Sequence, residues 1–143
     1  MEKINVVCPH CGGVNAIPLK ESYIKASCGH CKKSLLETKP LATDASVFDR
    51  LMLNDERLII ADFWAPWCGP CRSMAPSFEE AARHFALKAQ FIKINTEEQQ
   101  HLAARFGIRS IPTVIAFKNN RIIDQFSGAL PTPQIITFVQ KHL

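Results

Sequence analysis

The chain has 143 residues, of which 47% are hydrophobic and 21% charged, and a formal net charge of +4 at pH 7. These proportions are typical of a globular protein with a core, and they exclude fibrous, low-complexity and disordered classes. Residues 1–40 hold six lysines and three glutamates, or +3, and residues 41–143 hold eleven basic and ten acidic residues, or +1, so neither part has the dense basic patch of a nucleic-acid surface.

The apolar pattern and the cysteine content indicate the cellular compartment in which the protein is expected. No run approaches the roughly 18 apolar residues of a membrane span, and the first residues contain no apolar run long enough for a signal peptide. We therefore expect a cytoplasmic protein. Thiols stay reduced in that compartment, so its six cysteines indicate metal binding or catalysis rather than structural disulfides.

The first four cysteines lie in residues 1–40 as two C-x-x-C pairs, CPHC and CGHC. Together they have the spacing C-x2-C-x16-C-x2-C, formed by Cys8, Cys11, Cys28 and Cys31. This spacing predicts one four-cysteine zinc site, with each pair on a knuckle and a short hairpin joining the pairs. The segment has few large apolar side chains, so zinc would supply much of its folding free energy. The histidines between the cysteines, His10 and His30, are interpreted as non-ligands.

A C-x-x-C pair can also be a redox dithiol that cycles through a disulfide. Such a pair is typical of a junction between a buried strand and a helix, where the helix N-terminus lowers a thiol pKa. Gly12 and Gly13 follow the first pair and discourage a helix, and residues 32–39 leave room for only a short one before Pro40. A zinc site is therefore the favoured interpretation, and a ribbon that releases zinc when its thiols oxidise stays open as an alternative.

Residues 35–46 are predicted to separate two domains, a zinc-ribbon module at 1–40 and an α/β domain at 41–143. Pro40 stops regular structure. After it, the polar residues from Thr43 to Ser46 resemble the cap region of a helix.

The second part alternates helices and strands. The run LIIADFW at 58–64 is nearly continuous and apolar, which indicates a strand buried on both faces. A helix is predicted after Cys68, with a kink at Pro76. The other predicted elements are helices near 46–54, 97–106 and 132–142 and strands at 91–94, 113–117 and 121–126. Asn119 and Asn120 join the last two strands, because asparagine tolerates the positive φ of a tight hairpin.

The third pair, CGPC at Cys68 and Cys71, is predicted to be the reactive one. The buried strand runs directly into it and an amphipathic helix leaves from it, which puts Cys68 at a helix N-terminus. Cys68 is thus the predicted nucleophile, and Cys71, one turn later, would resolve the mixed disulfide. Half of a metal site is the alternative, but residues 41–143 contain no second pair to complete it.

Asp62 interrupts the apolar strand six residues before Cys68. A bare buried carboxylate is costly, so an edge or hydrated position would be the simplest explanation. Its closeness to a dithiol that must lose a proton favours another hypothesis, in which a raised pKa lets Asp62 take the proton from Cys71. Lys93, in the neighbouring predicted strand, is either its charge partner or a solvated lysine.

Residues 42–143 resemble the thioredoxin family. The motifs that carry the resemblance are ADFWAPWCGPCRSMAP, KIN, GIRSIPT, FKNN and SGAL, in this order and spacing. It implies the α/β thioredoxin fold, a mixed central sheet flanked by helices, and activity as a protein-disulfide reductase. Asn120 stands where the family commonly has glycine and Glu97 where it commonly has aspartate.

The resemblance also implies roles for individual residues. Cys68 would be the nucleophile, Cys71 the resolving thiol and Asp62 the proton acceptor. The substrate surface would be formed by Trp67, Gly69, Pro70, Ile111, Pro112 and Gly128, with Pro112 as the family's cis-proline.

A four-cysteine module ahead of such a domain resembles bacterial thioredoxins of the thioredoxin 2 type. This resemblance implies one structural zinc, no bound organic cofactor, and reduction by thioredoxin reductase, which draws electrons from NADPH. Disulfide-containing proteins would be the substrates, with no membrane or nucleic-acid partner, and a monomer is the default expectation. A competing hypothesis makes the ribbon a redox-sensing module that recruits partners, with the thioredoxin domain as a scaffold.

Overall fold

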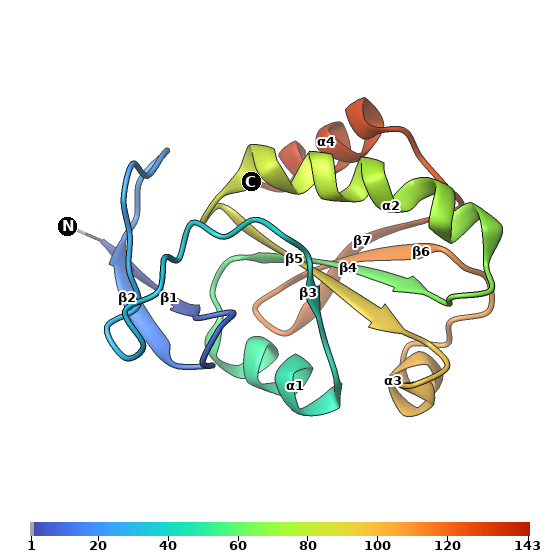
Figure 1. Cartoon of the computed structure of the whole chain (residues 1–143), viewed down its shortest axis with the longest axis horizontal. Coiled ribbons are helices and arrows are strands. Elements are labelled where there is room, and N and C mark those ends of the chain that lie inside the picture. The colour runs from blue at the N-terminus through green and yellow to red at the C-terminus, as the bar shows by residue number, and fades with distance from the viewer. Residues whose placement is uncertain (1) are drawn as a thin grey trace.

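A computed structural model describes residues 2–143 (Figure 1). In chain order its elements are β1 (Lys3–Val7), β2 (Val14–Pro18), β3 (Leu41–Ala42), α1 (Ala45–Asn54), β4 (Leu58–Trp64), α2 (Gly69–Ala82), the 3-10 helix η1 (Arg83–Phe85), β5 (Ala89–Asn95), α3 (Gln100–Arg105), β6 (Thr113–Lys118), β7 (Arg121–Ser127) and α4 (Thr132–Gln140). Within this part of the chain, no helix has the length and apolar character needed to cross a membrane.

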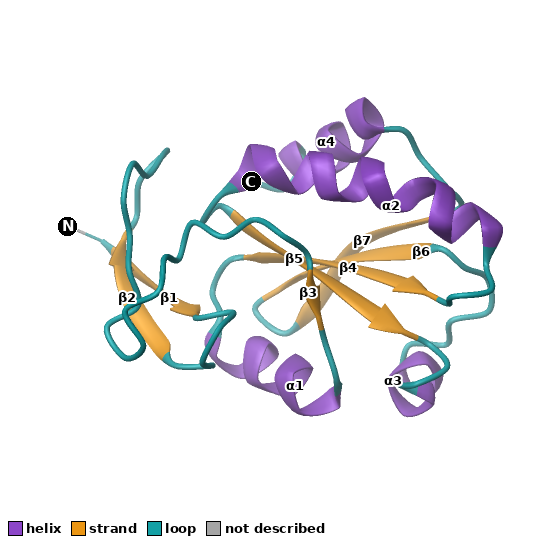
Figure 2. Ribbon diagram, viewed as in Figure 1, coloured by secondary structure: helices purple, strands orange, loops and turns teal. Residues whose placement is uncertain are grey.

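A five-stranded mixed sheet lies at the centre of the larger part, in the order β3-β5-β4-β6-β7. Strands β3 and β4 run parallel to β5, whereas β6 runs antiparallel to β4 and to β7. Helices α2 and α4 cover one face and α1 and α3 the other (Figure 2). This is the mixed sheet flanked by helices that the sequence predicts.

Strand β4 is buried on both faces, as its apolar run predicts. Ile60 packs in the cluster that contains residues of α2 and α4, and Phe63 packs in the cluster that contains residues of α1 and α3. The alternation follows from strand geometry, because successive side chains point to opposite faces. β4 therefore fixes the position of whatever follows Trp64.

The first C-x-x-C pair lies in the turn of a hairpin. β1 pairs antiparallel with β2, and Val7 lies opposite Val14. The prediction of a hairpin between the two cysteine pairs is therefore wrong, since the strands of the hairpin enclose the first pair. The knuckle itself makes the turn: Cys8 donates its N–H to the Gly13 carbonyl at 2.8 Å, and Gly12 has a φ of +77°.

A buried ion pair fastens the N-terminal segment to the sheet. The Arg57 guanidinium lies 2.7 Å from the Asp55 carboxylate, and their side chains are 4% and 0% exposed. The same carboxylate accepts the Val7 N–H at 3.0 Å, and Arg57 donates to the Val7 carbonyl at 3.4 Å. The loop between α1 and β4 thus holds both polar groups of the residue before Cys8. We call Val7, Asp55 and Arg57 the interface clamp.

Other contacts extend this interface. The Asn5 N–H donates to the Glu56 carboxylate at 2.6 Å, and Lys88 donates to the Lys20 carbonyl at 2.9 Å. Leu87 completes a small apolar cluster with Val6, Cys8, Ile17, Cys28 and Leu35. The N-terminal segment therefore closes its core with a residue from the other part of the chain. The division into domains at 1–40 and 41–143 stays a prediction.

Most elements of residues 41–143 lie where the sequence predicts them, and two of the departures have physical causes. The helix expected at 97–106 begins at Gln100, because the Asn95 side chain accepts the N–H groups of Glu97 and Glu98 and forms a turn. Strand β3 was not predicted, since two residues are too short for an apolar pattern. Asn119 and Asn120 have φ of 52° and 63°, which confirms the predicted tight turn.

Candidate active site and candidate metal centre

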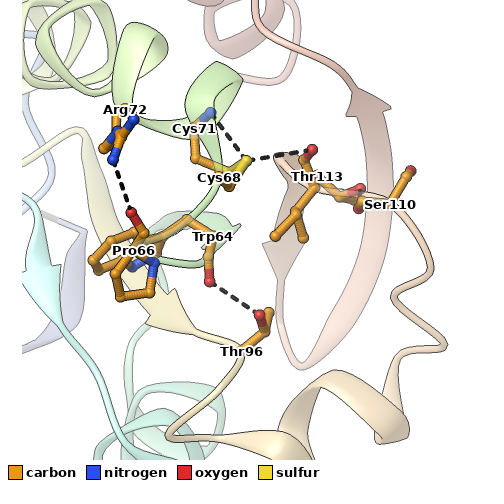
Figure 3. Close-up of a disulfide and its surroundings, with 9 residues drawn as sticks. Trp64, Pro66, Cys68, Cys71, Arg72, Thr96, Ser110 and Thr113 are labelled. Atoms are coloured by element: carbon orange, nitrogen blue, oxygen red, sulfur yellow. Dashed lines mark hydrogen bonds between the residues drawn. A yellow bond between two sulfur atoms is a disulfide. The ribbon is translucent and has the colours of Figure 1, made fainter.

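Cys68 and Cys71 lie at the N-terminus of α2 and are joined by a disulfide (Figure 3). Cys68 is the N-cap, and its sulfur accepts the Cys71 backbone N–H at 3.2 Å. Gly69 and Pro70 occupy the first helical positions. Backbone N–H groups there have no partner within the helix, so the absence of an N–H in proline costs no hydrogen bond. The Cys68 sulfur thus lies at the positive end of the helix dipole, which favours a thiolate.

The segment before β6 lies beside this disulfide. The Ile111–Pro112 bond is cis, and the Ile111 carbonyl oxygen lies 3.7 Å from the Cys68 sulfur. Gly128, with a φ of +91°, donates its N–H to the Pro112 carbonyl at 2.9 Å, and nothing lies within 4 Å of a Cβ added there. Trp67 is 65% exposed. The predicted substrate residues therefore lie at one end of the sheet, where β4 and β7 end and β6 begins.

Asp62 is buried on the face of β4 that α2 covers. It shares this face with Ile60, which packs against residues of α2, the helix that carries Cys71. Asp62 is 1% exposed, and neither carboxylate oxygen has a hydrogen-bond partner within residues 2–143. Burial raises the pKa of Asp62 from its ordinary value of 3.8 to about 7. β4 is the central strand of the sheet, so the edge position considered from the sequence is wrong.

Lys93 acts on Asp62 through its charge. The two residues are partners in the parallel pairing of β4 and β5, and the charge of Lys93 lowers the Asp62 pKa against the larger effect of burial. The Lys93 ammonium also lies 4.6 Å from the centroid of the Trp64 ring. Asp62 and Lys93 form no direct hydrogen bond, and burial remains the main influence on the Asp62 pKa.

The four N-terminal cysteines come together as two knuckles of the same geometry. Their sulfur atoms all lie within 4.8 Å of one another. In the first knuckle the Gly12 N–H donates to the Cys8 carbonyl, and in the second the Lys32 N–H donates to the Cys28 carbonyl. Lys32 has a φ of 69°, close to that of Gly12. The predicted pairing of both C-x-x-C motifs in one cluster is confirmed.

This cluster fits a zinc ion. Tetrahedral Zn–S bonds of about 2.3 Å place sulfur atoms about 3.8 Å apart, and the Cys8–Cys31 and Cys11–Cys28 sulfur distances are both 3.7 Å. The cysteines are the only candidate ligands gathered within residues 2–143, and His30 instead faces the Val14 carbonyl at 3.3 Å.

Backbone donors prepare Cys28 for this role. The Cys31 N–H, followed by the Asn15 amide, lowers the pKa of Cys28 to about 5, which favours the thiolate that a metal requires. Burial raises the pKa of Cys8 to about 11, so Cys8 would need the charge of the metal to ionise.

Asn15 is a functional candidate that sequence reasoning missed. Its amide nitrogen lies 3.4 Å from the Cys28 sulfur, and its oxygen accepts the Gly29 N–H at 2.8 Å. It thereby links β2 to the second knuckle. An isolated asparagine between cysteine pairs carries no distinctive spacing, so no sequence pattern could have identified it.

Comparisons with known proteins agree with this geometry. The thioredoxin family profile matches residues 37–141. Thioredoxin C-3 of Corynebacterium nephridii is 33% identical over 138 residues, which cover 96% of this chain and 94% of that protein. A thioredoxin of Haemophilus influenzae is 42% identical over 96 residues, covering 67% of this chain and 90% of that protein.

Solved structures show the same likeness. Plasmodium falciparum thioredoxin is 32% identical with a TM-score of 0.65, and the match covers 71% of this chain and 97% of that one. A mutant thioredoxin of Halobacterium salinarum is 26% identical with a TM-score of 0.67, covering 73% and 91%.

A mixed sheet with a C-x-x-C disulfide at the start of α2 defines a thiol-disulfide oxidoreductase of the thioredoxin fold. The profile match and the identity to curated thioredoxins specify the family more narrowly. The chain belongs to the thioredoxin family.

Proposed function

We propose that the protein is a protein-disulfide reductase that acts through Cys68 and Cys71. The observation that carries this proposal is the position of the Cys68 sulfur, which lies at the N-terminus of α2 and 3.7 Å from the Ile111 carbonyl oxygen. In the reduced protein, the Cys68 thiolate attacks one sulfur of a substrate disulfide and expels the other as a thiolate. Cys71 then attacks the Cys68 sulfur of the mixed disulfide and releases the second substrate thiol. The substrate gains two electrons, and Cys68 and Cys71 become a disulfide.

Asp62 is proposed as the group that accepts the proton from Cys71 in the second step. A base works best when its pKa lies near the working pH, and burial puts the Asp62 pKa at about 7. The burial of both Asp62 and Cys71 supports proton transfer within the protein, directly or through one water molecule.

The substrate is proposed to bind beside the disulfide, at the end of the sheet where β4 ends and β6 begins. An extended segment could pair with the backbone before Pro112, with the open space over Gly128 admitting its side chains. The surface of this site would consist of Trp67, Gly69, Pro70, Ile111, Pro112 and Gly128. The exposed Trp67 ring would supply apolar contact area.

The oxidised protein needs a supply of electrons, which we assign to thioredoxin reductase and, through it, NADPH. The chain itself would need no bound organic cofactor and would act as a monomer. The four-cysteine cluster is assigned one structural zinc, because its sulfur spacing fits a tetrahedral site. A compartment that keeps free thiols reduced, such as the cytoplasm, suits both centres.

Reduction of insulin disulfides, with thioredoxin reductase and NADPH as the electron source, tests this proposal. Cys68→Ser should reduce the rate to background, and Cys71→Ser should accumulate a covalent mixed disulfide with the substrate. Differential alkylation should show turnover confined to Cys68 and Cys71. Retention of full activity by Cys68→Ser would refute the proposal.

A redox-sensing ribbon is the second candidate function, favoured by the exposure of Cys11. It predicts that mild peroxide releases zinc while residues 41–143 stay folded. Zinc content and amide exchange, followed in the same sample, distinguish this function from a purely structural site.

A further inference from the structure

The four cluster sulfurs differ in their access to solvent. Cys8 and Cys28 are each 1% exposed, whereas Cys11 is exposed and Cys31 is intermediate. An incoming disulfide must approach the attacking sulfur in line with its own S–S bond, which needs open space on the solvent side. Access alone therefore favours reaction at Cys11.

A cavity of about 280 Å³ opens beside Cys11. One wall is the first knuckle, and the other comes from β3 and α1, with the apolar Leu41 and Val47 and the basic Arg50. This volume is close to the lower end of small-molecule sites, about 300 Å³. It suits a reagent of low molecular mass rather than a protein chain.

Arg50 gives this cavity a positive charge. Its guanidinium donates to the Gly12 carbonyl at 3.2 Å, next to Cys11 in the chain. A Cβ added at Gly12 would lie 3.4 Å from the Arg50 side chain, so the arginine lies directly over the knuckle. Within residues 2–143, no carboxylate lies within 4.0 Å of Arg50. Its charge is therefore free to act on the cluster and on an incoming anion.

That charge matters because a zinc ion with four thiolates carries a net charge of −2. Such a centre repels anions, and Arg50, which lines the same cavity as Cys11 and contacts Gly12, offsets part of the repulsion. A cation in a partly enclosed cavity also raises the local concentration of anions.

We propose that Cys11 is the reactive thiolate of the zinc cluster and that Arg50 steers small anionic disulfides to it. This inference rests on the zinc site proposed above. The Cys11 thiolate attacks one sulfur of the disulfide and forms a mixed disulfide, while the other half of the reagent leaves as a thiolate. The Cys11 sulfur is oxidised and the departing sulfur is reduced.

The neighbouring knuckle supplies the second step. The Cys28 sulfur lies 3.7 Å from that of Cys11. The Cys28 thiolate attacks the Cys11 sulfur, forms a Cys11–Cys28 disulfide and expels the second half of the reagent as a thiolate. The cluster would then offer a zinc ion only the Cys8 and Cys31 thiolates, which would favour its release. The product is a disulfide between the two C-x-x-C motifs rather than within one.

The test uses the zinc-loaded full chain with its Cys68–Cys71 disulfide intact. Zinc content is measured first. A substoichiometric amount of dithiobis(nitrobenzoate), a dianionic disulfide, is then added, and the labelled cysteine is located by peptide mass spectrometry. Zinc release is followed with a chelating dye. We expect the first label on Cys11 and, after its loss, a Cys11–Cys28 disulfide.

Variants of Arg50 test the steering. Arg50→Gln should slow the reaction with dithiobis(nitrobenzoate) about fivefold at low ionic strength, and leave the rate with neutral dithiodipyridine unchanged. Arg50→Lys should retain most of the anionic rate, and added salt should remove the difference. Arg121→Gln, which removes an exposed charge on β7, is the control for net charge.

Two results would overturn the inference while zinc is bound: a first label on Cys31, or equal slowing of both reagents by Arg50→Gln. The second result would mean that Arg50 only packs against the knuckle. A protein without zinc would instead refute the proposed metal site, and the inference with it, so the two failures are distinguishable.

Discussion

At the scale of single residues, burial in the fold destabilises the charged form of Asp62. Its pKa is about 7 in the folded protein, above its ordinary value of 3.8, because of burial. Between these two pKa values, the Asp62 carboxyl is ionised in the unfolded chain but still protonated in the native state. Stability contributed by the neutral carboxyl is therefore complete below about pH 4 and lost as the pH rises to about 7.

We predict that Asp62→Asn abolishes this loss. The variant and the parent should differ little at pH 4, and the variant should be more stable by up to about 4 kcal/mol at pH 8. Denaturant unfolding across this range measures the difference. Asp124→Asn is the control of opposite sign, because the His142 and Lys141 side chains lower the Asp124 pKa to about 2. A difference that does not vary with pH would contradict the assignment of a raised Asp62 pKa.

At the scale of elements, the loop between α1 and β4 carries the interface clamp. Removing one partner of a buried ion pair leaves the other charge uncompensated. We predict that Asp55→Asn lowers the free energy of unfolding by about 3 kcal/mol. Asp49→Asn, which breaks the exposed pair with Arg105 at 3.1 Å, should cost less than about 1 kcal/mol. Equal losses of unfolding free energy in the two variants would mean that the buried ion pair stabilises the protein no more than the exposed pair does.

The elements also show what a single sequence can predict. LIIADFW lies at β4 as predicted, since a strand buried on both faces imposes its own apolar pattern. The C-x-x-C spacings located both centres, because metal and redox chemistry fix the separation of their sulfurs. The clamp could not be predicted: Asp55 and Arg57 look like surface charges, and their partner Val7 lies 48 residues from Asp55. The cavity that joins Cys11 to Arg50 depends on the same long-range packing.

At the scale of the whole molecule, the four-cysteine cluster and the sheet share one interface. Cys8 directly follows Val7, whose N–H donates to Asp55 and whose carbonyl accepts from Arg57. Leu87, which follows η1, packs among residues of the ribbon. If the proposed zinc holds the two knuckles together, its loss should loosen β1 and expose the clamp to water. The two centres are then coupled through packing, although the dithiol lies at the opposite end of β4.

We predict that removing zinc from the folded protein has a graded effect along the chain. Amide exchange should become fast throughout residues 3–36, because metal binding supplies much of the folding free energy of such a segment. Protection at 55–58 should fall by at least about tenfold, since local opening now exposes the clamp. Residues 59–64 of β4 and strand β6 should keep their protection, with the Cys68–Cys71 disulfide still formed. Hydrogen exchange with mass spectrometry, before chelation and after zinc is restored, measures all three regions. Unchanged protection at 55–58 would show that the ribbon and the sheet are independent, and uniform loss across β4 and β6 would show that zinc supports the entire fold.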